Sequence, residues 1–130
     1  MKRLTLVLAV LASPVLAEGD PAAGEGMFQT FCAACHGMDA QGNGPMSSVL
    51  VVEPPDLTLL AQSNGGVFPV FDVVRQIDGR DPMMAHGGEM PVFGALFDFP
   101  DGSIASESGQ PIVTARPIAD VAAWLKSVQD

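Results

Sequence analysis

The chain has 130 residues, of which 15 are acidic and 6 are basic, and its formal net charge is −9. Such an acidic balance argues against nucleic acid and against an anionic membrane surface as partners. With 14 glycines, 11 prolines and no repeat period, the sequence predicts one small, loop-rich domain whose modest core needs a further organising element.

The first 17 residues have the layout of an export signal. Two basic residues open the segment, an apolar run continues to Leu16, and Ala17 is a small residue suited to cleavage. The apolar run is too short for a membrane-spanning helix of about 20 residues, and an uncleaved N-terminal anchor is the alternative. We therefore expect residues 1–17 to be a signal peptide, cleaved after Ala17, that directs export of the protein.

Removal of this segment changes the charge of the remaining domain. Cleavage after Ala17 takes away two basic residues and leaves four against fifteen acidic ones, a formal charge of −11. No later apolar run has the length needed to span a bilayer. We expect residues 18–130 to form one domain without stable membrane insertion.

A first helix is predicted from residue 21 to the region of the cysteines. Asp20 is a favourable N-cap, and Pro21 suits the first helical position. Gly24 and Gly26 each cost about 1 kcal/mol relative to Ala in a helix. Two such glycines in one helix indicate that another element passes close to it.

The only two cysteines of the chain lie in the sequence CAACH, where Cys32, Cys35 and His36 form a C-x-x-C-H motif. A disulfide would close too small a loop to restrain the unfolded chain much, and a thioredoxin-like pair needs a βαβ pattern that this sequence lacks. A zinc site needs four ligands, and His86 could be the fourth. Adjacent ligands at Cys35 and His36 are awkward for a tetrahedron, however.

Covalent haem attachment explains every residue of the motif. Two thiols at this spacing can form thioether bonds with the two vinyl groups of one porphyrin, and the next imidazole then points at the iron. The motif is a strong signal in an exported chain. We therefore expect one covalent haem c, held by Cys32 and Cys35, with His36 as an axial ligand of its iron.

After the motif, the sequence predicts a long loop and two helices. Residues 37–55 are rich in turn-forming residues and predict the loop. A short helix is predicted over 56–63, behind Asp56. A longer helix is predicted over 68–78, where apolar residues recur at helical spacing and Gly79 ends the pattern.

Two further loops and a last helix complete the prediction. Residues 80–94 are irregular by composition, and residues 98–112 form a polar, turn-rich stretch that predicts a surface excursion. Pro117 begins the last helix, whose apolar residues form one stripe. The fold class expected from these elements is all-α, with three main helices and long loops.

Five stretches of the sequence match the pattern of a known family: CAACHG (32–37), GNGP (42–45), PPDLT (54–58), MPVFG (90–94) and ADVAAWLKSV (119–128). On these stretches the chain resembles the small class I c-type cytochromes of bacterial periplasms. The resemblance covers most of the chain after the predicted signal. It implies a cytochrome c-like fold, in which long loops wrap around one covalently attached haem and the N- and C-terminal helices cross.

The resemblance assigns four residues to the helix crossing. Gly24 and Phe28 match the first helix, and Val121 and Trp124 match the last one. A glycine at the crossing lets two backbones approach closely, which accounts for its presence in spite of its cost to the helix.

The resemblance also implies a partner for the second nitrogen of the His36 ring. In the family this nitrogen donates to a backbone carbonyl after the haem motif, and Pro45 in GNGP is at the matching position. Such a bond orients the imidazole and raises its basicity.

The iron needs a second axial ligand, for which Met83, Met84, His86 and Met90 are candidates. Met90 precedes Pro91, which favours an extended backbone that can aim a thioether out of a loop. MPVFG also matches the ligand loop of the family. We expect Met90 to bind the iron, and the other three residues remain alternatives.

A haem with His36 and Met90 in both axial positions has no open site for a substrate, and its chemistry is one-electron transfer. We therefore expect a periplasmic electron carrier without enzyme activity. Two other functions stay open: a haem subunit of a periplasmic dehydrogenase or oxidase complex, and a gas-binding or peroxidatic haem protein. The acidic charge predicts redox partner proteins with a basic or neutral docking patch.

Overall fold

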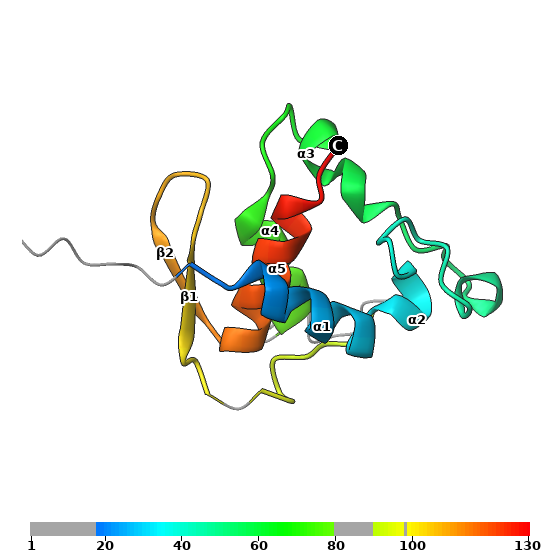
Figure 1. Cartoon of the computed structure of the whole chain (residues 1–130), viewed down its shortest axis with the longest axis horizontal. Helices are drawn as coiled ribbons and strands as arrows, with labels where there is room; N and C mark the ends of the chain where they lie inside the picture. Colours follow the sequence, from blue (N-terminus) through cyan, green and yellow to red (C-terminus); the bar gives the residue numbers. More distant parts are fainter. Residues whose placement is uncertain (1–17, 80–89, 98) are drawn as a thin grey trace, which may run out of the picture.

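The computed structural model describes residues 18–79, 90–97 and 99–130, and these residues are mostly helical (Figure 1). The elements in chain order, with η denoting a 3₁₀ helix, are α1 (Pro21–Phe31), α2 (Ala33–His36), η1 (Ser47–Val49), η2 (Leu57–Leu59), α3 (Leu60–Ser63), α4 (Val70–Asp78), β1 (Gly102–Ala105), β2 (Pro111–Thr114) and α5 (Arg116–Ser127). The predicted signal peptide, residues 1–17, lies outside the described residues, as do three of the candidate iron ligands, Met83, Met84 and His86.

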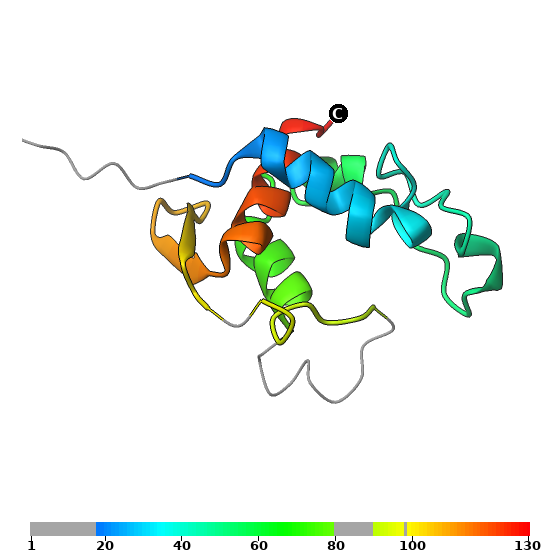
Figure 2. The same ribbon diagram turned by 60° about the horizontal axis from the view of Figure 1, so that its bottom comes forward.

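Helix α1 lies across helix α5, as Figures 1 and 2 show. Asp20 caps the start of α1 by accepting a hydrogen bond from the Ala22 amide at 2.9 Å. Gly24 then faces the backbone of Asp120, and a Cβ at position 24 would overlap the Asp120 carbonyl group. The glycine therefore lets the two helix backbones meet without an intervening side chain.

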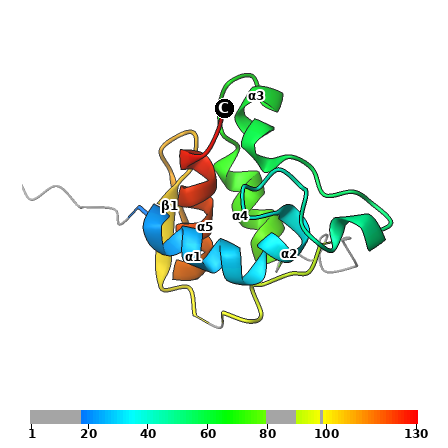
Figure 3. The ribbon, with the colours of Figure 1, turned by 45° about the vertical axis from the view of Figure 1, so that its right-hand side comes forward.

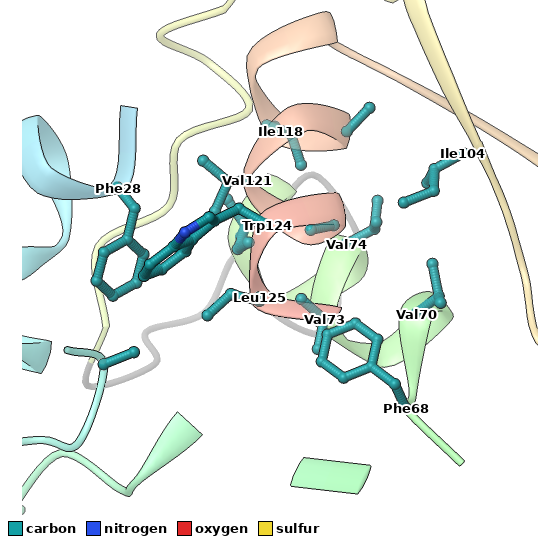
Figure 4. Packing of buried hydrophobic residues seen from close by; sticks show 14 of the residues in the cluster. Phe28, Phe68, Val70, Val73, Val74, Ile104, Ile118, Val121, Trp124 and Leu125 are labelled. Carbon is teal, nitrogen blue, oxygen red and sulfur yellow. The ribbon is translucent and has the colours of Figure 1, made fainter. Parts of the chain in front are cut away.

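The crossing is completed by aromatic packing. The rings of Phe28 on α1 and Trp124 on α5 lie with their centroids 4.5 Å apart and their planes tilted by 41° (Figure 4). Both side chains are buried, and Val121 is buried on the same helix as Trp124. Such an aromatic contact stabilises by about 0.5–1.5 kcal/mol beyond the burial of its area.

Helix α4 packs beside α5 with an amphipathic face. Its four buried residues are Val70, Val73, Val74 and Ile77. Their three- and four-residue spacing places them on one side of the helix, and Figure 4 shows this side turned toward α5. Gly79 ends α4 in the left-handed conformation, with φ of 62°, as its position after the apolar pattern predicts.

The stretch 98–112, predicted as a surface excursion, contains a short hairpin, so the described fold is mostly helical, as the all-α prediction expects, with one two-stranded addition. Strands β1 and β2 form an antiparallel hairpin in which Ile104 pairs with Ile112. Ile104 is buried in the core next to α5 (Figure 4). Strands of four residues are too short to show a clear alternation in a polar sequence, so the pattern alone favoured a loop.

The segment between α2 and α4 follows the sequence prediction. Residues 37–55 contain only the short η1 helix, and Figures 1 and 3 show this loop extending away from the body of the molecule. The predicted helix over 56–63 is formed by η2 and α3. The side chain of Gln129 ties α3 to the C-terminus, because it donates to the Leu57 carbonyl and accepts from the Ala61 amide, both at 2.8 Å.

Candidate functional site

The C-x-x-C-H motif lies at a break between two helices. Helix α1 ends at Phe31, Cys32 is the C-cap, and α2 begins at once. The amides of Cys35 and His36 both donate to the Cys32 carbonyl, at 3.1 and 2.9 Å. This tight turn places all three functional side chains within five residues, and the two thiols are not joined in a disulfide.

The GNGP loop supports the motif from outside. The Gly42 amide donates to the His36 carbonyl at 2.8 Å, and the Gly44 amide donates to the Cys35 carbonyl at 3.2 Å. A Cβ at Gly44 would overlap the backbone of the motif, so only glycine allows this approach. The loop therefore caps the C-terminal end of α2, and it orients the turn that carries His36.

A cavity of about 360 Å³ lies beside the motif. Its lining is contributed by the ends of α1 and α2, by η2 and α3, by α4 and α5 and by the segment that begins at residue 90. Most of the lining residues are apolar, and the full set is Phe28, Cys32, His36, Pro55, Leu57, Leu60, Pro69, Asp72, Val73, Gln76, Ile77, Met90, Val121 and Leu125. The cavity is thus a mainly apolar chamber with one imidazole, one thiol and one thioether in its wall.

His36 is a partly buried side chain whose neutral form is favoured. Burial lowers the pKa of the imidazole, and the backbone carbonyl of Pro55 acts in the opposite direction. The Nδ1 atom is buried and makes no hydrogen bond of ordinary geometry, although Pro55 is close enough to affect the pKa. A neutral imidazole with its lone pair available is the form that binds a metal.

The Pro45 carbonyl as the partner of His36 stays a prediction, and the structure places a different proline beside the imidazole. Pro45 borders a separate hollow together with Asn43 and Gly44, whereas Pro55 lines the same cavity as His36. Both prolines follow turn residues in the sequence, so spacing alone did not distinguish them. The carbonyl next to His36 is that of Pro55.

The thiol of Cys32 is held in its neutral form. Burial raises its pKa to about 11, with a smaller contribution from the neighbouring Cys35. Burial therefore makes the thiolate of Cys32 less favourable than that of an exposed cysteine. Among the described residues, no group of three or more His, Cys, Asp or Glu side chains is arranged to hold a metal ion. The zinc alternative includes His86, which lies outside those residues.

Met90 lines the cavity from the side of α4. Its side chain is half-buried, and the residues that follow it are attached to the end of that helix. The Phe93 amide donates to the Ile77 carbonyl at 2.8 Å, and the Gly94 amide donates to the Asp78 carbonyl at 2.9 Å. Met90 is the candidate second ligand that lies within the described residues, and it lines the same cavity as His36.

Several residues of the site were not singled out from the sequence. Pro55, Leu57 and Leu60 form one wall of the cavity, and Val73 and Ile77 form another. The stretch PPDLT was a recognisable signal for the first wall, since it matches the family pattern. The second wall is an ordinary amphipathic helix face, which has the same appearance in any core.

Comparison with known proteins gives a consistent result. A family profile described as Cytochrome c matches residues 21–129. Among curated proteins, the chain is similar to cytochrome c-554(547) of Halothiobacillus neapolitanus, with 45% identity over 49 residues. This match covers 36% of the chain and 54% of that protein, so it spans about half the length of the relative. No solved structure matches the chain at a significant level.

Proposed function

The chain belongs to the cytochrome c family, and from this premise we propose that it is an exported electron carrier with a single covalent haem c. Membership of the family indicates haem-based electron transfer, and its members are typically electron carriers. We further propose that it carries one haem, that His36 and Met90 bind the iron, that it is periplasmic, and that its redox partner has a basic or neutral docking patch.

The residues of the cavity fit a haem. Cys32, His36 and Met90 line one mainly apolar chamber, and Cys35 is three residues from Cys32 with its thiol unbridged. The buried Nδ1 of His36 lacks a hydrogen bond of ordinary geometry while the Pro55 carbonyl lies nearby. This is the arrangement in which a small shift of the ring completes that bond and leaves the other nitrogen for a metal. The occurrence of His36 and Met90 in the wall of one cavity is the observation that carries the proposal.

The protein groups have separate tasks in this proposal. When bound, haem c supplies a one-electron ferric–ferrous couple. The thiols of Cys32 and Cys35 hold it covalently, and the soft thioether of Met90 favours the reduced form. The aliphatic walls exclude water from the site, which also favours the less charged, reduced state.

The proposal is tested on the holoprotein purified from a host that attaches haem c. Acid–acetone extraction should leave all haem on the polypeptide, at one haem per chain, because two thioether bonds survive acid. The ferric protein should show the weak far-red absorption of a sulfur–iron bond, and the ferrous protein should not bind carbon monoxide at neutral pH. Haem released into the solvent would contradict covalent attachment, and rapid carbon monoxide binding would favour a gas-binding or peroxidatic protein. Elution in a stable complex on gel filtration would favour the role of a dedicated subunit.

The location is proposed from the N-terminal sequence and the family. Bacterial c-type cytochromes are usually exported, and residues 1–17 have the layout of a signal peptide. Within the described ranges, no helix is both long and apolar enough to cross a membrane. N-terminal sequencing of the protein from a periplasmic fraction should begin at Glu18, and retention of residues 1–17 on a membrane-bound protein would contradict the proposal.

The partner is proposed to be a redox protein with a basic or neutral docking patch. The segment 46–52 exposes Met46, Val49, Val51 and Val52, and no residue in it is charged. The Met46 amide donates to the Ala34 carbonyl at 2.9 Å, so this apolar segment is attached directly to the haem motif. An apolar face beside the motif, within a chain of strong negative charge, suits a transient partner of opposite or no charge.

Small redox reagents of either charge test this electrostatic prediction. The oxidation state of the holoprotein is followed by stopped-flow with a cationic ruthenium ammine and with ferricyanide as an anionic reagent. Because opposite charges attract, the rate with the cationic reagent should fall as salt is added, while the rate with ferricyanide should rise. The Debye length falls from about 30 Å at 0.01 M to about 10 Å at 0.1 M, which sets the salt range. Equal responses to salt for both reagents would contradict a negative field at the site of electron entry.

A further inference from the structure

Residues 90–94, the segment that carries Met90, are attached to the C-terminus of α4. Two consecutive backbone carbonyls of that helix end, those of Ile77 and Asp78, accept the amides of Phe93 and Gly94 at 2.8 and 2.9 Å. Carbonyls at a helix end have no partner within the helix, so they can accept hydrogen bonds from the backbone of another segment. The position of Met90 therefore depends on where α4 ends and how firmly that end is held.

A close contact between Gly79 and the side chain of Val92 reinforces this attachment. Gly79 follows α4 with φ of 62°, and a Cβ at this position would overlap the side chain of Val92. The Met90 segment thus passes directly over the turn that ends the helix. A displacement of this turn would therefore change both the Val92 contact and the two backbone hydrogen bonds beside it.

Asp78 is an unusual residue for this place. It is the last residue of α4, where the negative end of the helix dipole disfavours a carboxylate. Its Oδ2 atom accepts a hydrogen bond from Oγ1 of Thr114 at 2.9 Å. Thr114 is 0% exposed, so water cannot take the place of its hydroxyl as the donor to Asp78 unless the surrounding residues move.

The hairpin that carries Thr114 also contacts the other end of α4. Glu107, in the turn between β1 and β2, accepts a hydrogen bond from the Phe71 amide in the first turn of α4 at 3.2 Å. A carboxylate is favourable there, since the helix N-terminus is positive. The hairpin therefore contacts α4 near both ends, with an exposed bond near the N-terminus and a part-buried bond at the end that carries the Met90 segment.

We propose that Thr114 and Asp78 are positioning residues for Met90: the hydroxyl–carboxylate bond holds the end of α4, and the end of α4 holds the segment that presents the thioether. The inference rests on the proposed His36 and Met90 ligation. It gives the hairpin a role in the strength of the Met90–iron contact, although the hairpin does not line the cavity.

The central variant is Thr114→Val, which keeps the shape of the side chain and removes the hydroxyl. In the ferric holoprotein, added imidazole competes with Met90 for the iron, and loss of the far-red band reports the replacement. A hydrogen bond to a charged acceptor is strong enough that its loss should raise the apparent affinity for imidazole by about three- to tenfold. Thr114→Ser, which restores the hydroxyl, should return the affinity close to that of the wild type.

Thr58→Val is the matched control. Thr58 is also buried and also donates to a carboxylate, that of Asp56, at 2.6 Å. The same chemical change there should lower the urea midpoint measured by far-UV circular dichroism, but it should leave imidazole affinity unchanged. Thr114→Val should change both quantities, because its bond supports the ligand segment as well as the fold.

A double-mutant cycle gives a second measurement that does not depend on one variant alone. Asp78→Asn keeps the shape of the side chain and weakens the acceptor, and the double variant Thr114→Val/Asp78→Asn should show little additional gain in imidazole affinity over Thr114→Val, since both changes act on the same bond. Additive effects, or an effect of Thr114→Val no larger than that of Thr58→Val, would overturn the inference while leaving the electron-carrier proposal intact. A wild-type ferric protein without the far-red band would instead refute Met90 ligation, and the inference with it.

Discussion

The two candidate iron ligands are held by different kinds of contact. His36 is fixed by neighbours in the sequence: its amide donates to the Cys32 carbonyl, and its carbonyl accepts from Gly42. The segment of Met90 is fixed by distant residues, through carbonyls of α4 and through a bond from the hairpin at Thr114 to Asp78. One side of the cavity is therefore built locally, and the other depends on the whole fold.

This difference predicts unequal strength. Contacts between near neighbours close short loops and cost little chain entropy, whereas the Met90 side requires several segments to be in place together. Regions with few supporting contacts open first in native proteins. We expect the Met90 side of the cavity to open before the His36 side, and the following variants, in order of decreasing effect, test this difference.

The largest effect is expected from removing the local anchor with Cys32→Ala/Cys35→Ala. Without covalent attachment, the apolar cavity of about 360 Å³ has no permanent occupant. Its apolar lining would then be exposed to water, and small domains have a net stability of only about 5–15 kcal/mol to offset this loss. Far-UV circular dichroism should show a largely unfolded chain.

The single variant Cys35→Ser is the control for this experiment. It keeps one thioether at Cys32, so haem should stay bound through acid–acetone extraction and most helical signal should persist. A double variant that keeps its full helical signal without haem would show that the protein, and not the cofactor, organises the core.

The next effect concerns the distal side alone. Met90→Ala should abolish the far-red band of the ferric protein, lower the reduction potential and allow carbon monoxide to bind, because a soft ligand is lost and a coordination position opens. Helical content should change little, since the side chain is only half-buried. Visible spectroscopy and potentiometric titration make the measurement.

Met38→Ala is the matched control for Met90→Ala. Met38 is 62% exposed and follows the haem motif by two residues, so its removal should leave both band and potential in place. If Met90→Ala behaves like Met38→Ala, the second ligand lies elsewhere, and Met83, Met84 and His86 become the candidates.

A smaller effect is expected at the helix crossing, which supports both sides of the cavity. Gly24→Ala places a Cβ into the Asp120 carbonyl, so the helices must separate, and we expect a loss of about 1–3 kcal/mol in the free energy of unfolding. Gly26→Ala is the control, because a Cβ there meets nothing within 4 Å. It should stabilise by up to about 1 kcal/mol through helix propensity. Urea unfolding measures both changes in the free energy of unfolding, and changes of the same sign would contradict the close approach of α1 and α5.

The smallest effect is expected in the loop on the His36 side. The Asn43 side chain and the Gln41 amide donate to Asp39 and lower the pKa of its carboxyl from the ordinary 3.8. Asn43→Ala should raise that pKa, while Gln41→Ala should leave it lowered, since the Gln41 contact comes from the backbone. NMR titration of the Asp39 carboxyl makes the measurement.

The sign of the accompanying stability change follows from linkage. A lowered pKa in the folded state means that the unfolded chain binds more protons in this range, so the contribution is complete above the ordinary pKa of Asp39 and is lost as the pH falls through the lowered value. The difference in stability between wild type and Asn43→Ala should therefore disappear in acid. A difference that grows as the pH falls would contradict the hydrogen bond.

Features with a local cause were predictable from the sequence. Asp20 and Pro21 begin α1 as expected, and Gly79 ends α4, because caps depend on the chemistry of one or two residues. The motif of Cys32, Cys35 and His36 indicated haem for the same reason, since its chemistry depends on spacing within five residues, and the family comparison agrees with it.

The hairpin shows where local patterns were insufficient. Its strands, Gly102–Ala105 and Pro111–Thr114, have no alternation strong enough to mark them in the sequence. They form because Ile104 can be buried against α5 and Thr114 can reach Asp78. Propensity for strands depends on such neighbours, which a single segment does not reveal.

The sequence alone therefore predicted the longer helices and the attachment motif, while η1 and the break between α1 and α2 were not predicted. The tertiary structure decided which carbonyl lies next to His36, since Pro45 and Pro55 are both turn prolines and only packing places Pro55 in the cavity wall. It also decided what holds Met90, because the bonds to Ile77 and Asp78 join residues that approach only when α4, α5 and the hairpin are packed together. A contact between distant residues has no spacing signature, and its existence is a property of the folded chain.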